Sequence, residues 1–147
     1  KIGDMSSESS RLGQSPMRSP TVFNYFRPGY VPPNTAFAST GLAAPELQIT
    51  NESSVAGYLN FMLNTIRNGV ADVSTQYLSE APLAGDPTGL VNRLNLLLCA
   101  GQLNATQQQT IRDAIATISL TASTGAFTRV IAAVMLVMGS SAYLAQR

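Results

Sequence analysis

The placement of proline divides this chain near Thr50 and limits what the first part can form. Six of the eight prolines precede Thr50. Because proline lacks a backbone N–H and has a fixed φ, it is excluded from helix interiors and central strands. Residues 1–50 are therefore predicted to form an irregular arm, and a helical body is expected in residues 51–147.

Within the arm, three stretches differ in composition. Residues 1–15 are polar and rich in serine, which is typical of a mobile loop or tail. Ser19 is a suitable N-cap and Pro20 suits the first helical position, so a short helix is predicted near residues 20–26. Further prolines then favour extended backbone, and an ordered but irregular strap is predicted over residues 28–49.

After Thr50, apolar residues recur with helical spacing. The first face is marked by residues at i, i+4, i+7 and i+11, namely Val55, Leu59, Met62 and Ile66. Asp86 and Asn104 are suitable N-caps, and Gly69 and Gly101 are suitable stops. These signals predict long helices over residues 52–68, 87–100, 105–119 and 126–145. With no competing strand pattern, the chain is predicted to be all-α, with a bundle of about four helices after the arm.

The last of these helices is apolar on nearly every face, which is typical of a central helix. Its uncharged run, Val130 to Gln146, is at the lower limit of length for a membrane span and contains Gly139, Ser140 and Ser141. A buried core helix is the preferred interpretation, and a membrane-associated module is a weaker alternative.

Composition excludes several classes of function. Charged residues are 12% of the chain, about half of the roughly 25% that is typical, and the net charge of +1 offers no basic surface for nucleic acid. The chain has no histidine and one cysteine, so the usual zinc ligands and the usual base for a nucleophile are missing. We expect no cofactor and no dedicated metal site. Cys99 lies in an apolar stretch and is predicted to be buried and unreactive.

The densest cluster of aromatic side chains lies between Thr21 and Pro33. Its aromatic residues could stack on a ligand while arginines hold an anion, or they could instead fix the arm in apolar grooves. Both interpretations stay open here. The candidate interaction residues are Arg18, Phe23, Tyr25, Phe26, Arg27, Tyr30 and Glu46.

Glu46 also has two interpretations. It could be a catalytic acid, but no second carboxylate is close in sequence, since Glu52 lies in the first turn of the next helix, where it favours the helix dipole. Pairing of Glu46 with an arginine, or dipole stabilisation, is the simpler reading. No catalytic residue is assigned.

The length of the arm suggests that it covers another surface. Structureless segments longer than about 12–15 residues are uncommon in compact domains, yet this arm is too aromatic for a disordered tail. We expect it to lie against the remainder of its own polypeptide or against a second copy of the chain. The alternative is that it wraps its own helices.

Short motifs across the chain carry a family resemblance. In the arm they are Leu12-Gly13-Gln14-Ser15-Pro16, Arg18-Ser19-Pro20, Val22-Phe23-Asn24, Phe26-Arg27-Pro28-Gly29-Tyr30, Pro32-Pro33 and Pro45-Glu46-Leu47-Gln48. In the helices they are Ala56-Gly57-Tyr58-Leu59-Asn60-Phe61, Leu94-Asn95-Leu96-Leu97 and Tyr143-Leu144-Ala145-Gln146-Arg147. Together they resemble the C-terminal third of a bacterial family catalogued as domain of unknown function 1800. The family's Ser-Pro-Glu is replaced here by Ser140-Ser141-Ala142, so no carboxylate role transfers to that position.

The resemblance implies a mainly helical part of a longer bacterial protein, often exported and often encoded beside another uncharacterised exported protein. We therefore expect a structural or interaction segment, the C-terminal helical part of an exported protein of unknown function, in the periplasm or at the cell surface. The co-encoded protein is a further candidate partner. The alternative is the non-catalytic part of an enzyme, such as a hydrolase, whose active residues lie in an N-terminal region outside this chain.

Overall fold

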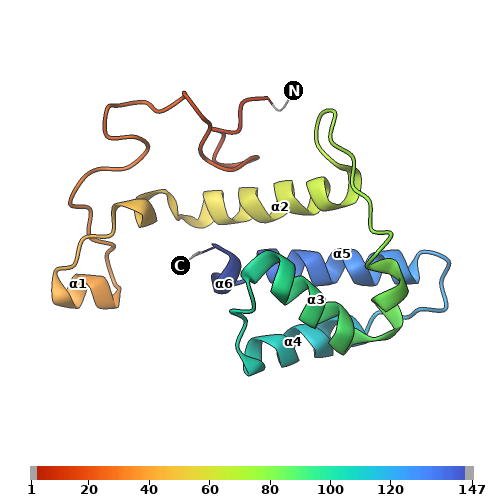
Figure 1. The fold of residues 1–147 in the computed structure, drawn as a ribbon. Helices are drawn as coiled ribbons and strands as arrows, with labels where there is room; N and C mark the ends of the chain where they lie inside the picture. Colours follow the sequence, from red (N-terminus) through yellow and green to blue (C-terminus); the bar gives the residue numbers. More distant parts are fainter. Residues whose placement is uncertain (1–2, 145–147) are drawn as a thin grey trace. The chain divides into compact units, whose positions relative to one another are not determined.

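The computed structural model describes residues 3–144, and over this range the chain is all-α (Figure 1). Six α-helices and two short 3-10 helices occur in the described residues, with no β-strand, which confirms the predicted fold class. The helices that the sequence predicts as long ones correspond to α2, α3, α4 and α5.

The chain divides between Met62 and Leu63 into two compact units. We call residues 3–62 the N-terminal unit and residues 63–144 the helical unit. The division falls within helix α2, Glu52–Asn68, which contributes residues to both. The two units are described separately below.

Helix α2 has the bounds that its apolar spacing predicts. At its start, the Asn51 side chain accepts a hydrogen bond from the Ser54 N–H at 3.0 Å, and the Ser54 hydroxyl accepts one from the Asn51 N–H at 2.9 Å. This reciprocal cap satisfies two backbone donors that the helix leaves free. At its end, Gly69 has a φ of +79° and donates its N–H to the Thr65 carbonyl at 2.8 Å. A Cβ at Gly69 would overlap the Val73 carbonyl oxygen, so the turn that follows requires glycine.

Helices α3, Pro87–Cys99, and α4, Ala105–Ala116, begin where their caps predict. The Asp86 carboxylate caps α3 by accepting a backbone N–H of the first turn at 3.1 Å. At α4, Asn104 and Gln107 form the predicted capping box, with distances of 2.8 and 3.0 Å between side-chain oxygens and backbone nitrogens.

Helix α4 ends three residues earlier than the prediction of residue 119. The Arg129 side chain explains the difference, because its guanidinium donates to the carbonyl oxygens of Ala116 and Ile118. These carbonyls are satisfied without a further helical turn.

Residues 126–145, predicted as one helix, form two. Helix α5 spans Gly125–Met138 and helix α6 spans Ser141–Leu144, while residue 145 lies outside the described range. The break occurs at Ser140, whose hydroxyl donates to the Val137 carbonyl at 2.6 Å and accepts from the Tyr143 N–H at 3.3 Å. Serine thus offers the backbone an alternative to continued helix. Among the described helices, none combines the length and hydropathy needed to cross a bilayer.

The core of the helical unit lies where α5 meets α3, α4 and the 3-10 helix η2, Ala81–Gly85 (Figure 1). Its largest fully buried side chains are Leu90, Val91, Ile115, Val130 and Val137. The contacts of α5 with each of these elements confirm the central position that its apolar sequence predicts.

The N-terminal unit holds two further short elements, α1, Ala36–Thr40, and the 3-10 helix η1, Pro45–Ile49. The predicted helix near residues 20–26 does not form. Instead, the Thr21 hydroxyl accepts from the Phe23 N–H at 3.1 Å, and a tight turn closes with the Asn24 N–H on the Thr21 carbonyl at 3.1 Å. The threonine side chain competes with the helix for backbone groups.

The serine-rich start of the chain, predicted as a mobile polar stretch, packs on α2 in its described part. Met5 is buried, and the Leu12 N–H donates to its carbonyl at 3.1 Å. The Arg11 guanidinium lies 5.7 Å from the centre of the Phe61 ring. The loop crosses α2 at Gly57, where a Cβ would overlap the carbonyl oxygen of Glu8. Only glycine allows so close an approach of two backbones.

Candidate functional site

A pocket of about 490 Å³ in the N-terminal unit gathers four of the seven predicted interaction residues. Its lining is rich in aromatic and proline side chains, with one arginine, and consists of Pro20, Thr21, Phe23, Asn24, Tyr25, Phe26, Arg27, Pro28 and Gln48. We call this the aromatic pocket. Its volume lies within the range of about 300–1,000 Å³ that small-ligand sites occupy.

Hydrogen bonds from outside the turn hold two lining residues in place. The Tyr25 hydroxyl donates to the Ser15 carbonyl and accepts from the Ser15 N–H, both at 3.1 Å. The Arg27 N–H donates to the Gln48 side-chain oxygen at 2.6 Å. Because these ties fix the backbone on both sides of Phe26, the pocket is formed in the free chain and needs little ordering on binding.

Apolar surface around the pocket is uncovered. Phe23 is 59% exposed and Val22 is 95% exposed, while Tyr25 and Phe26 are half-buried. A second hollow of about 310 Å³ adjoins the first, shares Asn24 and Tyr25 with it, and is bordered by the exposed Met17.

The remaining predicted residues lie outside the lining. Arg18 is 3.6 Å from an Asp4 carboxylate oxygen, and hydrogen bonds from Ser6 hold the pKa of the exposed Asp4 below its usual value, which favours the carboxylate form in this ion pair. Tyr30 is half-buried, and its carbonyl accepts the Ala44 N–H at 2.8 Å. Glu46 is exposed in the first turn of η1, where a carboxylate favours the helix dipole.

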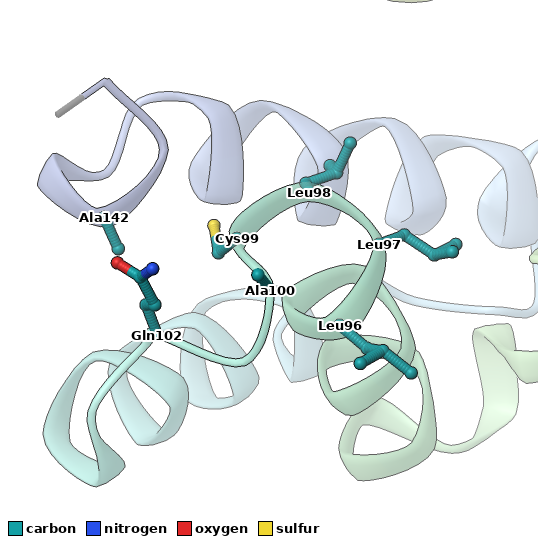
Figure 2. Close-up of a pocket in the computed structure, with 7 residues that line it drawn as sticks. All are labelled: Leu96, Leu97, Leu98, Cys99, Ala100, Gln102 and Ala142. Carbon is teal, nitrogen blue, oxygen red and sulfur yellow. The ribbon is translucent and has the colours of Figure 1, made fainter. Parts of the chain in front are cut away.

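A smaller pocket of about 280 Å³ lies in the helical unit at the end of α3 (Figure 2). It is lined by Leu96, Leu97, Leu98, Cys99, Ala100, Gln102 and Ala142. In Figure 2 the side chains of Leu96 and Leu97 point away from the Cys99 thiol. Cys99 is buried, as predicted, and burial raises the pKa of its thiol, although a hydrogen bond with Ser140 opposes that shift. A protonated thiol is a poor nucleophile, so the geometry favours a packing role.

Two residues that shape the structure, Gln48 and Arg129, are not among the candidates predicted from the sequence. Gln48 fixes the aromatic pocket from 21 positions away, and no local pattern connects it to Arg27. Arg129 is buried in the helical unit and donates to the Ala84 carbonyl at 2.9 Å as well as to the end of α4. Arg129 could have been identified from the sequence, because it is the one charged residue within the apolar sequence of α5 and a charge in such a helix requires partners.

Metal binding has no evident site in the described range of residues 3–144. No three side chains of histidine, cysteine, aspartate or glutamate come together there. The aromatic pocket therefore offers a ligand apolar contacts, the single cation of Arg27, and the neutral amides of Asn24 and Gln48.

Comparison with known proteins adds one finding. The chain matches the family described as "Protein of unknown function (DUF1800)" over residues 2–145. No curated protein and no solved structure shows significant similarity to it. The match covers nearly all of the sequence and agrees with the resemblance carried by the arm and helix motifs. The chain therefore belongs to the DUF1800 family of proteins of unknown function.

Proposed function

We propose that this chain is a protein–protein interaction segment whose contact surface is the aromatic pocket and its rim. The observation that carries the proposal is the exposure of large apolar side chains around a preformed hollow. Val22 and Phe23 are 95% and 59% exposed, beside a lining that hydrogen bonds already hold in place. Fully burying one such side chain contributes about 1.5–3 kcal/mol, so a partner that covers both would gain substantially.

The thin core of the N-terminal unit supports the same proposal. Among residues 3–62, Met5 and Pro32 are the buried apolar side chains, whereas Phe37, Leu42 and Leu47 are each more than a third exposed. Exposed apolar patches bordered by polar residues are typical of protein-binding surfaces. The low share of charged residues, 12%, is in keeping with this, because interface cores are depleted of charge.

The proposed partner is a polypeptide: the remainder of the protein's own chain or a second copy of it. Following the family resemblance, we place the interaction in an exported bacterial protein, with a co-encoded exported protein as a further candidate. An apolar rim with one cation suits a folded protein surface better than a nucleic acid, which requires several cations in register.

Photocrosslinking tests the proposal directly. A photoreactive phenylalanine analogue replaces Phe23, and in a matched control it replaces Leu78, which is 82% exposed in the helical unit and outside the pocket lining. Both proteins are produced in the natural host, irradiated, and their crosslinked peptides identified by mass spectrometry. We expect position 23 to crosslink to one defined polypeptide segment outside its own 147 residues, and position 78 to give no such segment.

Mixing isotopically light and heavy chains separates crosslinks within one molecule from crosslinks between copies. Crosslinks from position 23 solely to residues 63–144 of the same molecule would mean that the chain covers its own pocket. That result, or equal crosslinking from positions 23 and 78, would overturn the proposed function.

A further inference from the structure

We propose that the aromatic pocket binds a peptide segment carrying an acidic side chain next to a large apolar one, and that Arg27 recognises the acidic group. This inference rests on the proposed function and names the chemistry of its partner. Three features of the pocket support it: an apolar lining, a single arginine without a side-chain partner among the described residues, and an amide group able to bond to a peptide backbone.

The apolar part of the partner follows from the lining. Phe23, Tyr25 and Phe26 supply aromatic surface, and Pro20 and Pro28 supply rigid apolar edges. A flat or branched apolar side chain can pack in such a hollow in offset or edge-to-face contact with the rings. Polar side chains would lose hydration there without gaining equivalent bonds.

The charge of the partner follows from the arginines of the N-terminal unit. Arg18 is paired with Asp4, and the Arg11 guanidinium lies over Phe61 and donates to the Met5 sulfur at 3.7 Å. Among the described residues, the Arg27 guanidinium has neither an ion pair nor a hydrogen bond.

Within residues 3–144, no carboxylate lines the aromatic pocket, so none of these lining residues neutralises the positive charge of Arg27. A guanidinium presents a planar fork of donors that matches a carboxylate in two parallel hydrogen bonds. The complementary ligand is therefore acidic.

The choice of a peptide follows from Gln48. Its side-chain oxygen accepts the Arg27 N–H at 2.6 Å, which fixes the amide and leaves its NH₂ group without a partner among the described residues. Gln48 also lines the pocket, so this group can donate to a peptide carbonyl. One cation beside neutral amides does not fit the closely spaced phosphates of a nucleic acid.

The test uses two synthetic peptides on the full chain. One is a blocked hexapeptide Gly-Ser-Asp-Phe-Ser-Gly, and its matched control has Asn in place of Asp. Binding is followed by the ¹H–¹⁵N NMR signals of residues 20–28 and Gln48 during titration to millimolar peptide. We expect saturable shifts confined to these residues, with the Asp peptide binding about two- to fivefold more tightly than the Asn peptide, as for an exposed ion pair of about 0.4–1 kcal/mol.

Variants assign this preference to Arg27. Arg27→Gln should bind the two peptides equally, and Arg27→Lys should keep part of the preference because it keeps the charge. Arg18→Gln removes the same charge from a residue outside the lining and should leave the two- to fivefold preference intact. Added salt should reduce the preference in the original chain, since exposed ion pairs are screened.

Three results would overturn the inference: no saturable shift with either peptide, equal affinity for both peptides in the original chain, or equal loss of the preference in Arg27→Gln and Arg18→Gln. Each is distinguishable from failure of the proposed function. A defined crosslink from position 23 to another polypeptide, together with any of these results, would retain the interaction surface and reject the acidic peptide.

Discussion

The two units of this chain hold their shape by different means. The helical unit buries apolar side chains from three long helices, and five of the largest, including Leu90 and Ile115, are almost fully removed from water. The N-terminal unit buries little beyond Met5 and Pro32 and depends more on hydrogen bonds between segments, such as those joining Tyr25 to Ser15. The comparison shows that hydrogen bonds between segments can order an irregular chain while its aromatic side chains stay exposed and available to contact a partner.

The largest expected effect is on the helical side of this comparison. Leu90→Ala removes a side chain that is 0% exposed, and it should lower the free energy of unfolding of the helical unit by about 4 kcal/mol. Urea unfolding followed by circular dichroism, with hydrogen exchange of α3 to α5, measures the loss. Leu97→Ala is the control on the same helix: Leu97 is 59% exposed and should cost about 0.5 kcal/mol or less. Equal losses in the two variants would contradict the assigned core.

The buried arginine provides the next largest effect. Arg129→Met leaves the carbonyls of Ala84, Ala116 and Ile118 without their donor. The Ala84 carbonyl is buried, whereas the hydrogen bonds to Ala116 and Ile118 are only partly buried. Since a buried unsatisfied group costs about 1–3 kcal/mol and water can reach the other two carbonyls, we expect a loss of about 2–3 kcal/mol. The same unfolding measurement applies. Arg112→Met removes a guanidinium that, within residues 3–144, bonds only to Gln109 of its own helix, and it should change stability by about 0.5 kcal/mol or less. A stable Arg129→Met protein would show that these carbonyls find water instead.

A smaller effect is expected at the loop crossing in the N-terminal unit. Gly57→Ala should favour α2 by up to about 1 kcal/mol through helix propensity, but the new Cβ would also lie 2.8 Å from the Ser9 carbonyl carbon. Because that neighbour is backbone, the loop must move away. We expect faster hydrogen exchange of residues 5–13 and unchanged exchange in α3 to α5.

Gly85→Ala is the matched control for this change, since no atom lies within 4 Å of a Cβ there. If Gly57→Ala left the exchange of residues 5–13 unaltered, the close packing of the loop on α2 would be disproved.

The smallest effect should be at the pocket rim. Phe23→Ser removes a side chain that is 59% exposed and should change stability by about 0.5 kcal/mol or less. Tyr25→Phe, a smaller change in shape, should cost about 1 kcal/mol because it removes both hydrogen bonds to Ser15. Thermal unfolding of both variants checks the order. The reverse order would mean that Phe23 supports the unit rather than serving a partner.

The sequence predicts the helical unit well because its signals are local. Caps such as Asn104 with Gln107, and stops such as Gly69, act within a few residues of the helix end that they define. The early end of α4 was missed because its cause, Arg129, lies 11 residues beyond Ile118 and acts through the folded structure. The break at Ser140 was missed because a serine hydroxyl is compatible with helix as well as with a cap.

The sequence predicts the N-terminal unit less well, because side-chain hydrogen bonds there compete with the local helix signals. Ser19 and Pro20 are a fair helix start, yet the Thr21 hydroxyl turns the backbone instead. The helix that does form, Ala36–Thr40, lies between a Thr35 cap and Gly41, within the segment predicted as an extended strap.

The aromatic members of the pocket could be predicted from their density in the sequence. The place of Gln48 could not, because it depends on how the chain returns to Arg27.

The crossing of the first loop over Gly57 has a consequence for the order of events as the chain folds. Glu8 and Gly57 are about 50 residues apart, so their meeting requires the closure of a long loop, which is slow compared with the growth of a helix. The surface that receives the loop is one face of α2, and that face exists only once the helix has formed. We therefore expect α2 to form before the start of the chain docks, so that the residues made first are among the last to reach their final place.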